Sequence, residues 1–211
     1  MNIDVLQEKL AHENLKSISI KSQAHHKEVF LKRPDLGRLL DAESKEQLMS
    51  YQRHYPTQYD VCIVMGDGLS AKAIEENSLR MTMSLQSNFK ELGWSLAPII
   101  IATGSRVALG DQVAEIFNIP MLIMMIGERP GLSSPDSMGI YYTWKSKTGC
   151  LDSSRNCISN IRSAGLSIPI ATQRLIALMK KSKEQQLSGV NLKDDHQVES
   201  VISPQTIQSL F

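Results

Sequence analysis

The chain has 211 residues and a formal net charge of +1, and 42% of its residues are hydrophobic. This length and apolar content suffice for one sizeable domain with an ordinary core. The near-zero net charge excludes a global field that would draw the chain to nucleic acid or to an anionic membrane. Aromatic residues make up only 5% of the chain, which also disfavours a surface that stacks nucleic-acid bases.

The cysteines and the N-terminus bear on the location of the protein. Cys62, Cys150 and Cys157 are odd in number and far apart in the sequence, which suits free thiols in a reducing compartment. No apolar run reaches the ~20 residues of a membrane-spanning helix, and the first residues show no secretory signal. We therefore expect a cytoplasmic protein that binds neither membrane nor nucleic acid.

The first elements along the chain are short. Residues 1–28 are expected to form a short N-terminal segment, with apolar residues spaced for one face of a small helix. Val29–Leu31 predicts a short strand. After a turn at Pro34, the spacing of leucines predicts a helix from about Asp35 to Tyr51.

The central part repeats the order strand, glycine loop, helix. The expected strands are 61–65, 97–102 and 121–126, and the expected helices are about 70–92 and 110–117. This order is typical of parallel βαβ units joined by right-handed crossovers. We expect an α/β fold over residues 29–190, a Rossmann-like domain with a mostly parallel sheet flanked by helices.

The C-terminal part is less regular. Ile140–Trp144 predicts a further strand, and Asp152–Arg162 is expected to be irregular. A helix is expected after Ser167, which has the side chain of an N-cap and precedes Pro169 in the first turn. Residues 191–211 are polar with little periodicity and are expected to form a C-terminal tail.

Each of the three central strands ends in a glycine-bearing loop. The carboxyl ends of parallel strands lie along one edge of a sheet, where α/β proteins bind their ligands. We therefore expect five side chains from these loops to be neighbours: Asp67, Arg106, Val107, Glu128 and Arg129. This argument predicts a site at that edge without naming its ligand.

A dinucleotide is the first alternative ligand. Gly66–Ala71 matches the G-x-G-x-x-A pattern between a strand and a helix. However, the charge of Asp67 inside the loop opposes the pyrophosphate that a helix N-terminus attracts. The acid expected about 20 residues further on is also missing, because the next strand ends in Ala102-Thr103-Gly104. A dinucleotide-binding oxidoreductase is kept as an alternative.

Metal and nucleophile chemistry find little support. The five histidines have no ligand spacing and no Cys-x-x-Cys occurs, so no metal site is expected. Cys157 beside Arg155 and Asn156 has the setting of an activated thiol. A small buried residue in an irregular loop is the favoured interpretation, since no histidine is near it in the sequence. We assign no catalytic residue.

Five segments of the chain resemble the small, or light, subunit of ethanolamine ammonia-lyase, in order and in approximate spacing. They are residues 33–38, 67–70, 106–112, 127–133 and 155–161. The resemblance covers about Val29 to Asn191. It implies an adenosylcobalamin-dependent radical enzyme that converts ethanolamine to acetaldehyde and ammonia. It also implies a Rossmann-type subunit that is active only with a large subunit, whose TIM barrel carries the substrate and most catalytic groups.

The resemblance further implies that Val107, Glu128 and Cys157 contact the adenosylcobalamin. Glu128 would accept hydrogen bonds from the amides that fringe the corrin ring. Val107 would offer apolar contact or its backbone, and Cys157 would be a compact packing contact rather than a nucleophile. The family also implies that the cofactor keeps its own base on cobalt, and no D-x-H-x-x-G motif that would supply a histidine is present. A pure assembly subunit without cofactor contact is the second alternative.

The resemblance bears on assembly and location as well. It implies a hetero-oligomer of paired large and small subunits, located in the cytoplasm or inside a bacterial microcompartment. Many family members carry a longer N-terminal segment that is partly linked to packaging, whereas this chain has only a short lead before Val29. The tail from Lys193 to Phe211 is longer than is usual for the family, and no role is assigned to it.

Overall fold

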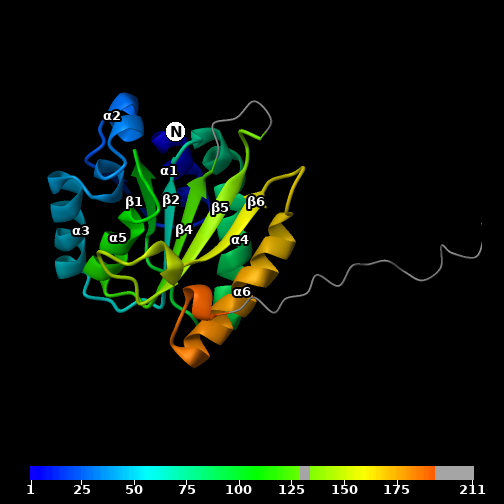
Figure 1. The fold of residues 1–211 in the computed structure, drawn as a ribbon. Helices are drawn as coiled ribbons and strands as arrows, with labels where there is room; N and C mark the ends of the chain where they lie inside the picture. The colour runs from blue at the N-terminus through cyan, green and yellow to red at the C-terminus, as the bar shows by residue number, and fades with distance from the viewer. Residues whose placement is uncertain (129–133, 193–211) are drawn as a thin grey trace, which may run out of the picture.

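The computed structural model describes residues 1–128 and 134–192, which form one sheet with helices on both faces (Figure 1). The strands are β1 (Ser17–Lys21), β2 (Val61–Gly66), β3 (Ile99–Thr103), β4 (Met121–Gly127), β5 (Met138–Trp144) and β6 (Asn156–Ile161). Their order across the sheet is β1-β3-β2-β4-β5-β6. Strands β1 to β4 pair in parallel. At one edge, β5 pairs with β4 in antiparallel orientation, and β6 pairs with β5 in antiparallel orientation. The predicted α/β class and mostly parallel sheet are confirmed.

The helices lie in two layers. They are α1 (Ile3–His12), α2 (Lys27–Lys32), α3 (Ala42–His54), α4 (Ala71–Glu91), α5 (Leu109–Phe117) and α6 (Ile168–Gln185), with 3₁₀ turns η1 (Leu36–Arg38), η2 (Asp152–Ser154) and η3 (Gly189–Asn191). Because strand side chains alternate between faces, Ile63 joins a first core with α1, α4 and α6. Its neighbour Val64 joins a second core with α3 and α5.

The second face of the sheet is only partly covered by helices. α3 packs against β1 and α5, and α5 packs against β4. Further along the sheet, Tyr141 of β5 is half-buried and Cys157 of β6, directly opposite it, is exposed. Figure 1 shows β5 and β6 facing the viewer, with α5 and α3 to one side. We call the part of this sheet face around Tyr141 and Cys157 the open face.

Strand β1 is an element that the sequence prediction missed. Residues Ser17–Lys21 lie inside the predicted N-terminal segment 1–28, yet they pair in parallel with β3 along their whole length. The segment is too short for its alternation of serine and isoleucine to be a clear signal, and the pairing comes from a partner about 80 residues away. The division of the chain at residue 28 stays a prediction.

Two predictions between β1 and β2 are wrong. The apolar run Val29–Leu31 lies in helix α2 rather than in a strand. Its backbone makes helical bonds, from the Phe30 N–H to the His26 carbonyl at 2.9 Å and from the Arg33 N–H to the Val29 carbonyl at 2.7 Å. The helix expected over 35–51 is instead the turn η1 followed by α3. Between them, the backbone of residues 39–41 makes tertiary hydrogen bonds, including one from the Leu40 N–H to Gln112 Oε1 at 2.7 Å.

The stretch expected to be irregular, Asp152–Arg162, contains strand β6. Its pattern is hard to read because, within the strand, only Ile158 and Ile161 are buried, whereas Cys157, Ser159 and Asn160 are exposed. Pairing with β5, rather than an apolar run, makes this segment a strand. The other predicted strands and helices are present with their ends shifted by a few residues at most.

Two further points concern the predicted tail and membrane-spanning helices. Residues 193–211 of the predicted tail lie outside the described residues, so the tail stays a prediction. Among the residues that the structure describes, no helix has both the length and the apolar character needed to cross a membrane.

Candidate functional site

The loops that follow β2, β3 and β4 meet at the carboxyl edge of the sheet, as predicted. The carboxylate of Asp67, after β2, accepts hydrogen bonds from the backbone N–H groups of Gly104 (2.9 Å) and Ser105 (3.0 Å), after β3. The N–H of Leu69 donates to the carbonyl of Gly127, at the end of β4, at 2.9 Å. These bonds fix the three loops against one another.

Arg106 serves to hold this edge together. Its guanidinium lies 4.3 Å from the centre of the Phe30 ring, and its Nη2 donates to the Phe30 carbonyl at 3.0 Å. Its own N–H donates to the Gly37 carbonyl at 2.7 Å. Arg106 therefore ties α2 and η1 to the loop after β3. Arg129, predicted to lie beside it, is outside the described residues.

A cavity of about 760 Å³ lies at the carboxyl ends of β1, β2 and β3, where a dinucleotide would be expected to bind. Asp67 lines it, and its carboxylate holds the N–H groups of Gly104 and Ser105. A pyrophosphate needs such backbone donors and is repelled by a carboxylate. The position of Asp67 therefore argues against the dinucleotide alternative, as its charge does in the sequence argument.

Glu128 lies at the end of β4 and is held by its neighbours in β5 and β6. Its Oε2 accepts a hydrogen bond from Ser137 Oγ at 2.7 Å and another from the Asn160 N–H at 3.1 Å. The pairing of β5 with β6 shifts register here and Asn160 has a φ of 60°, so its N–H points out of the ladder. The carboxylate lies over Gly139, where a Cβ would be 2.5 Å from Oε1.

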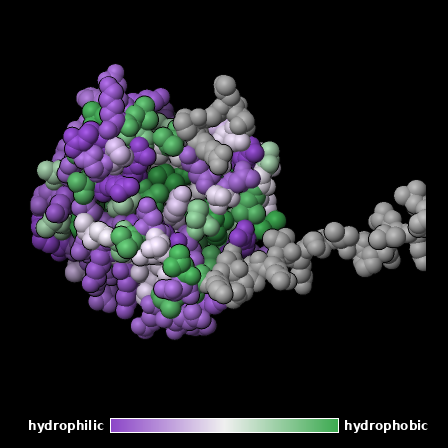
Figure 2. Space-filling view, in the orientation of Figure 1, coloured by the Kyte–Doolittle hydropathy of each residue, from purple (hydrophilic) through white to green (hydrophobic). Residues whose placement is uncertain are grey.

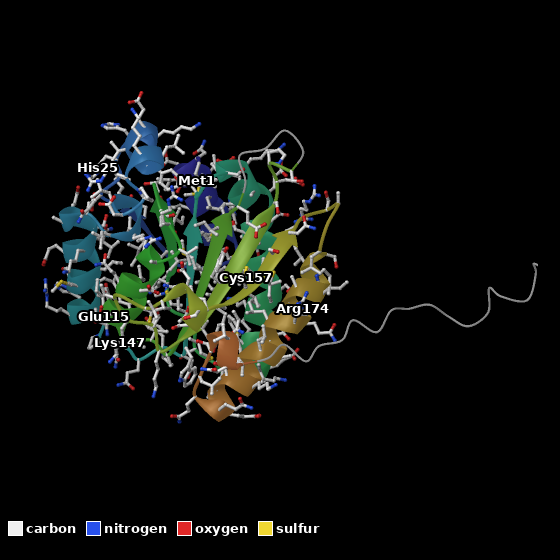
Figure 3. The ribbon with its side chains drawn as sticks, viewed as in Figure 1. Met1, His25, Glu115, Lys147, Cys157 and Arg174 are labelled. Carbon is white, nitrogen blue, oxygen red and sulfur yellow. The ribbon has the colours of Figure 1, made fainter. Side chains whose placement is uncertain are left out.

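Cys157 lies on the open face rather than in a buried loop, so the expectation of a small buried residue is wrong. Tyr141 is its cross-strand partner, and Figure 3 shows Cys157 in the middle of the face that turns toward the viewer. Although the side chain is exposed on one side, the atoms packed around its sulfur exclude part of the water and raise the pKa of the thiol, and the charge of Glu128 raises it further. Burial also raises the pKa of Tyr141 to about 12. Both groups are therefore protonated at neutral pH.

Val107 lies in the loop after β3, two residues before α5. Its side chain is partly exposed and packs against the second core, which Tyr141 also contacts. The carbonyl of Val107 accepts a hydrogen bond from Gly110 in the first turn of α5, at 3.2 Å. The structure thus brings Glu128 and Cys157 close to Tyr141, a residue that sequence reasoning missed. Val107 shares only the second core with Tyr141.

The chemistry of the open face suits a broad ligand. Figure 2 shows apolar surface near the centre of this side of the molecule, bordered by hydrophilic surface. Val107 and the ring of Tyr141 are apolar contacts, Glu128 is an anionic acceptor, and Cys157 is a neutral thiol. Tyr141 and Cys157 lie in strands and Glu128 directly follows one, which limits the movement of these groups. Such a surface can hold and orient a flat molecule with hydrogen-bond donors at its edge.

Gly139→Ala is expected to weaken ligand binding at this site without a large loss of stability. The added Cβ would displace the end of the flexible Glu128 side chain rather than backbone atoms, which costs little folding energy. It would nevertheless move the carboxylate off its position. Binding affinity and urea unfolding, measured on the same preparation, test this. A loss of stability as large as the loss of affinity would contradict the expectation.

The thiol of Cys157 is expected to ionise above the ordinary pKa of a cysteine. Alkylation rates measured against pH in a Cys150→Ser variant report this thiol, because Cys62 is fully buried and burial raises its pKa to about 12. Glu128→Gln removes a negative charge that opposes the thiolate, and so should bring the pKa back toward the ordinary value. A pKa below the ordinary value would identify an activated nucleophile instead.

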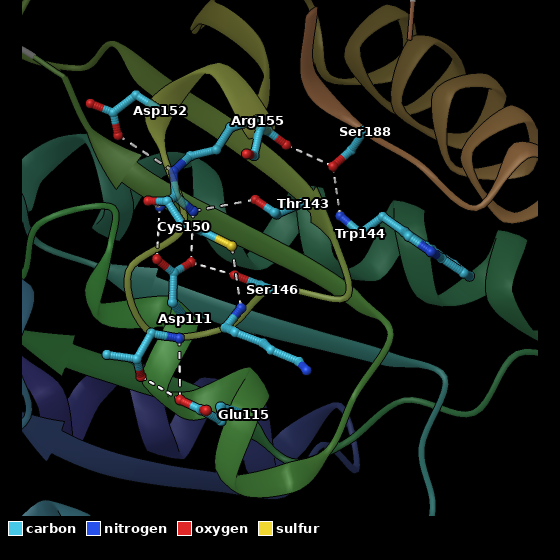
Figure 4. Close-up of polar contacts among 12 residues, drawn as sticks. Asp111, Glu115, Thr143, Trp144, Ser146, Cys150, Asp152, Arg155 and Ser188 are labelled. Carbon is cyan, nitrogen blue, oxygen red and sulfur yellow. Dashed lines mark hydrogen bonds and ion pairs between the residues drawn. The ribbon is translucent and has the colours of Figure 1, made fainter. Parts of the chain in front are cut away.

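A buried ion pair lies between α5 and the segment that leads into β6 (Figure 4). Arg155 donates from Nη1 to Asp111 Oδ1 and from Nη2 to Asp111 Oδ2, both at 2.7 Å. Both side chains are almost fully buried. Sequence reasoning missed the pair, because nothing in the sequence links residues 44 positions apart. Asp111 does occupy an inward position of the predicted helix, where a charged residue requires a partner.

No group of three or more His, Cys, Asp or Glu side chains is placed to hold a metal ion in residues 1–128 and 134–192. One pair of potential ligands lies close together, but the carboxylate has another role. His25 lies 4.0 Å from Asp41, whose carboxylate accepts the Ser44 N–H at the start of α3. The open face thus offers contacts to a ligand rather than a set of metal ligands.

Comparison with known proteins gives one consistent family. A family model described as ethanolamine ammonia-lyase light chain (EutC) matches residues 1–193. A protein named ethanolamine ammonia-lyase small subunit from Pseudomonas paraeruginosa is 45% identical over 185 residues, which are 88% of this chain and 68% of that protein. Proteins of the same name from Pseudomonas fluorescens and Pseudomonas putida are each 42% identical, over 94% and 95% of this chain and 72% and 74% of theirs.

Proposed function

The chain belongs to the ethanolamine ammonia-lyase light chain family, and we propose that it is the small subunit of an adenosylcobalamin-dependent ethanolamine ammonia-lyase. With a large subunit it would convert ethanolamine to acetaldehyde and ammonia, and it would be inactive alone. The names of the relatives support a lyase made of at least two kinds of subunit. The role proposed for this chain within that enzyme is to hold the cofactor against the large subunit.

One observation carries the cofactor-holding role. Two of the three residues that the family resemblance marks as corrinoid contacts meet on the open face: Cys157 lies opposite Tyr141, and the charge of Glu128 acts on both. The third, Val107, is 50 residues before Cys157 in the sequence and packs against the same core as Tyr141. A corrin ring is broad, flat and fringed with amides, and this face offers apolar contact together with a fixed carboxylate acceptor. The residues present therefore fit the group.

Each residue has a distinct part in binding. Glu128 would accept a hydrogen bond from a peripheral amide, with its own position set by Ser137 and Asn160. Val107 and Tyr141 would contact apolar parts of the ring, and Cys157 would pack as a neutral thiol. When bound, adenosylcobalamin supplies a cobalt–carbon bond that breaks to start radical chemistry. This chain's own contribution is to bind and orient.

The test is a titration of adenosylcobalamin into the large subunit, with and without this chain. Cofactor absorbance reports holoenzyme, and acetaldehyde release reports activity. Both are expected only when both proteins are present. Equal cofactor binding by the large subunit alone would overturn the cofactor-holding role and favour the alternative of a pure assembly subunit.

The dinucleotide alternative and the location of the protein can each be tested separately. Stabilisation of the isolated chain against heating by NAD(P) would favour a dinucleotide oxidoreductase instead, which the position of Asp67 argues against. The cytoplasm, with or without enclosure in a microcompartment, is the proposed location. Fractionation of cells that produce a tagged chain would distinguish the two.

A further inference from the structure

The Asp111–Arg155 pair is the most enclosed charged group in the described part of the chain. The side chain of Asp111 is 1% exposed and that of Arg155 is 2% exposed. The pair has polar neighbours as well: Ser146 Oγ donates to Asp111 Oδ1, and Arg155 Nη2 donates to the Cys150 carbonyl at 3.2 Å. Figure 4 shows these groups gathered between α5 and the segment that joins β5 to β6.

Stability alone does not account for such a pair. Removing two charges from water is costly, and replacing a buried ion pair by apolar residues of similar volume is often neutral or stabilising. Burial acts to lower the pKa of Arg155, but the hydrogen bonds and the charge of Asp111 outweigh it and raise that pKa. What a two-pronged arginine–carboxylate contact adds over apolar packing is direction, because it fixes both the distance and the angle between two elements.

The pair joins α5 to the segment that leads into β6, and each of its members lies near a residue that is proposed to contact the cofactor. Asp111 lies in the first turn of α5, four residues after Val107. Arg155 immediately precedes β6 and lies two residues before Cys157. The buried residues of α5 belong to the second core and those of β6 to the first, so apolar packing does not join the two elements. In the described residues, the ion pair links α5 to the start of β6.

We propose that Asp111 and Arg155 are positioning residues that set the spacing of Val107 and Cys157, and thereby the affinity of the open face for adenosylcobalamin. The inference rests on the proposed function for its ligand. Neither residue needs to touch the cofactor. Glu128 is positioned independently by Ser137 and Asn160.

The first arm of the test removes the charges but keeps the volume. Asp111→Leu/Arg155→Met, assembled with the large subunit, is expected to unfold near the wild-type urea concentration and to assemble normally. Its affinity for adenosylcobalamin should fall by about 10- to 100-fold, the range seen when a residue that orients a ligand-binding group is removed. Leu85→Ala is the control for stability, because it creates a cavity in the first core, on the face of the sheet opposite to α5.

The second arm measures spacing without any cofactor. Spin labels are attached to Cys157 and to Val107→Cys in a Cys150→Ser background, with the fully buried Cys62 left in place. The distance distribution between the labels should be narrow with the native pair and broad in the Asp111→Leu/Arg155→Met form. In the Leu85→Ala form it should stay narrow.

The two arms separate the possible failures. An unchanged distance distribution in the double variant would overturn the inference, and so would a broad distribution combined with unchanged cofactor affinity. If the wild-type complex binds no adenosylcobalamin, the proposed function fails. The spacing arm then still decides whether the pair sets the separation of α5 and β6. A loss of affinity in Leu85→Ala equal to that in the double variant would assign the effect to stability and overturn the positioning role.

Discussion

Asp111→Leu, with Arg155 left in place, is expected to lower the free energy of unfolding by about 3–5 kcal/mol. The arginine would stay in its almost fully buried position without the carboxylate that neutralises it. The remaining partners close to it are neutral oxygens of Thr143 and Cys150 and the exposed carboxylate of Asp152, 3.5 Å from Nε. These cannot replace two charged hydrogen bonds of 2.7 Å.

Urea unfolding of the chain, followed by circular dichroism, measures this effect. A loss of this size is a large fraction of the 5–15 kcal/mol typical of a domain, so the variant is studied at low temperature where it is still folded. Arg155→Met should be similarly harmful, and the double variant should recover most of the loss. If the two single losses add in the double variant, the two residues are not coupled, contrary to the structure.

Glu128→Ala is expected to weaken the binding of adenosylcobalamin to the two-subunit complex by about 10- to 100-fold. A hydrogen bond to a charged acceptor contributes about 1.5–3 kcal/mol, which corresponds to that change in the dissociation constant. The fold should suffer little, because Glu128 is only partly buried and the exposed Asn160 can bond to water when its partner is removed. Equilibrium dialysis with cofactor absorbance as the readout measures the affinity.

Glu115→Ala is the matched control for this variant. Glu115 is also a glutamate that bonds a neighbouring segment, through the N–H of Thr148 at 3.2 Å, but it is exposed and is not a residue of the open face. Its removal should leave cofactor affinity at the wild-type level. Unchanged affinity after Glu128→Ala would show that this residue does not make the cofactor contact that the family resemblance implies, even if the chain is the small subunit.

The sequence was most informative where a segment is buried on both sides. The strands β2 and β4 are continuous apolar runs because helices cover both of their faces, and this pattern can be read without a structure. The long helix α4 and its C-terminal Gly93, with φ of 66°, were equally readable. The meeting of the three loops followed from the parallel order of these strands.

Prediction failed where one face of a segment is open or where distant partners decide the structure. Strand β6 has two buried residues out of six and was expected to be irregular. The break between η1 and α3 depends on the side chain of Gln112, which bonds the backbone of Leu40. Local periodicity carries no information about such contacts.

The amino-acid sequence by itself determined the α/β class, the central strands and the family, because these depend on local apolar patterns and on the order of short motifs. It also named Val107, Glu128 and Cys157 through the resemblance. Only the tertiary structure decided that Cys157 lies opposite Tyr141 on an open face, that Ser137 and Asn160 hold Glu128, and that Asp111 and Arg155 form a buried pair. The reason is physical: each of these facts is a contact between segments far apart in the chain, which strand pairing and packing create.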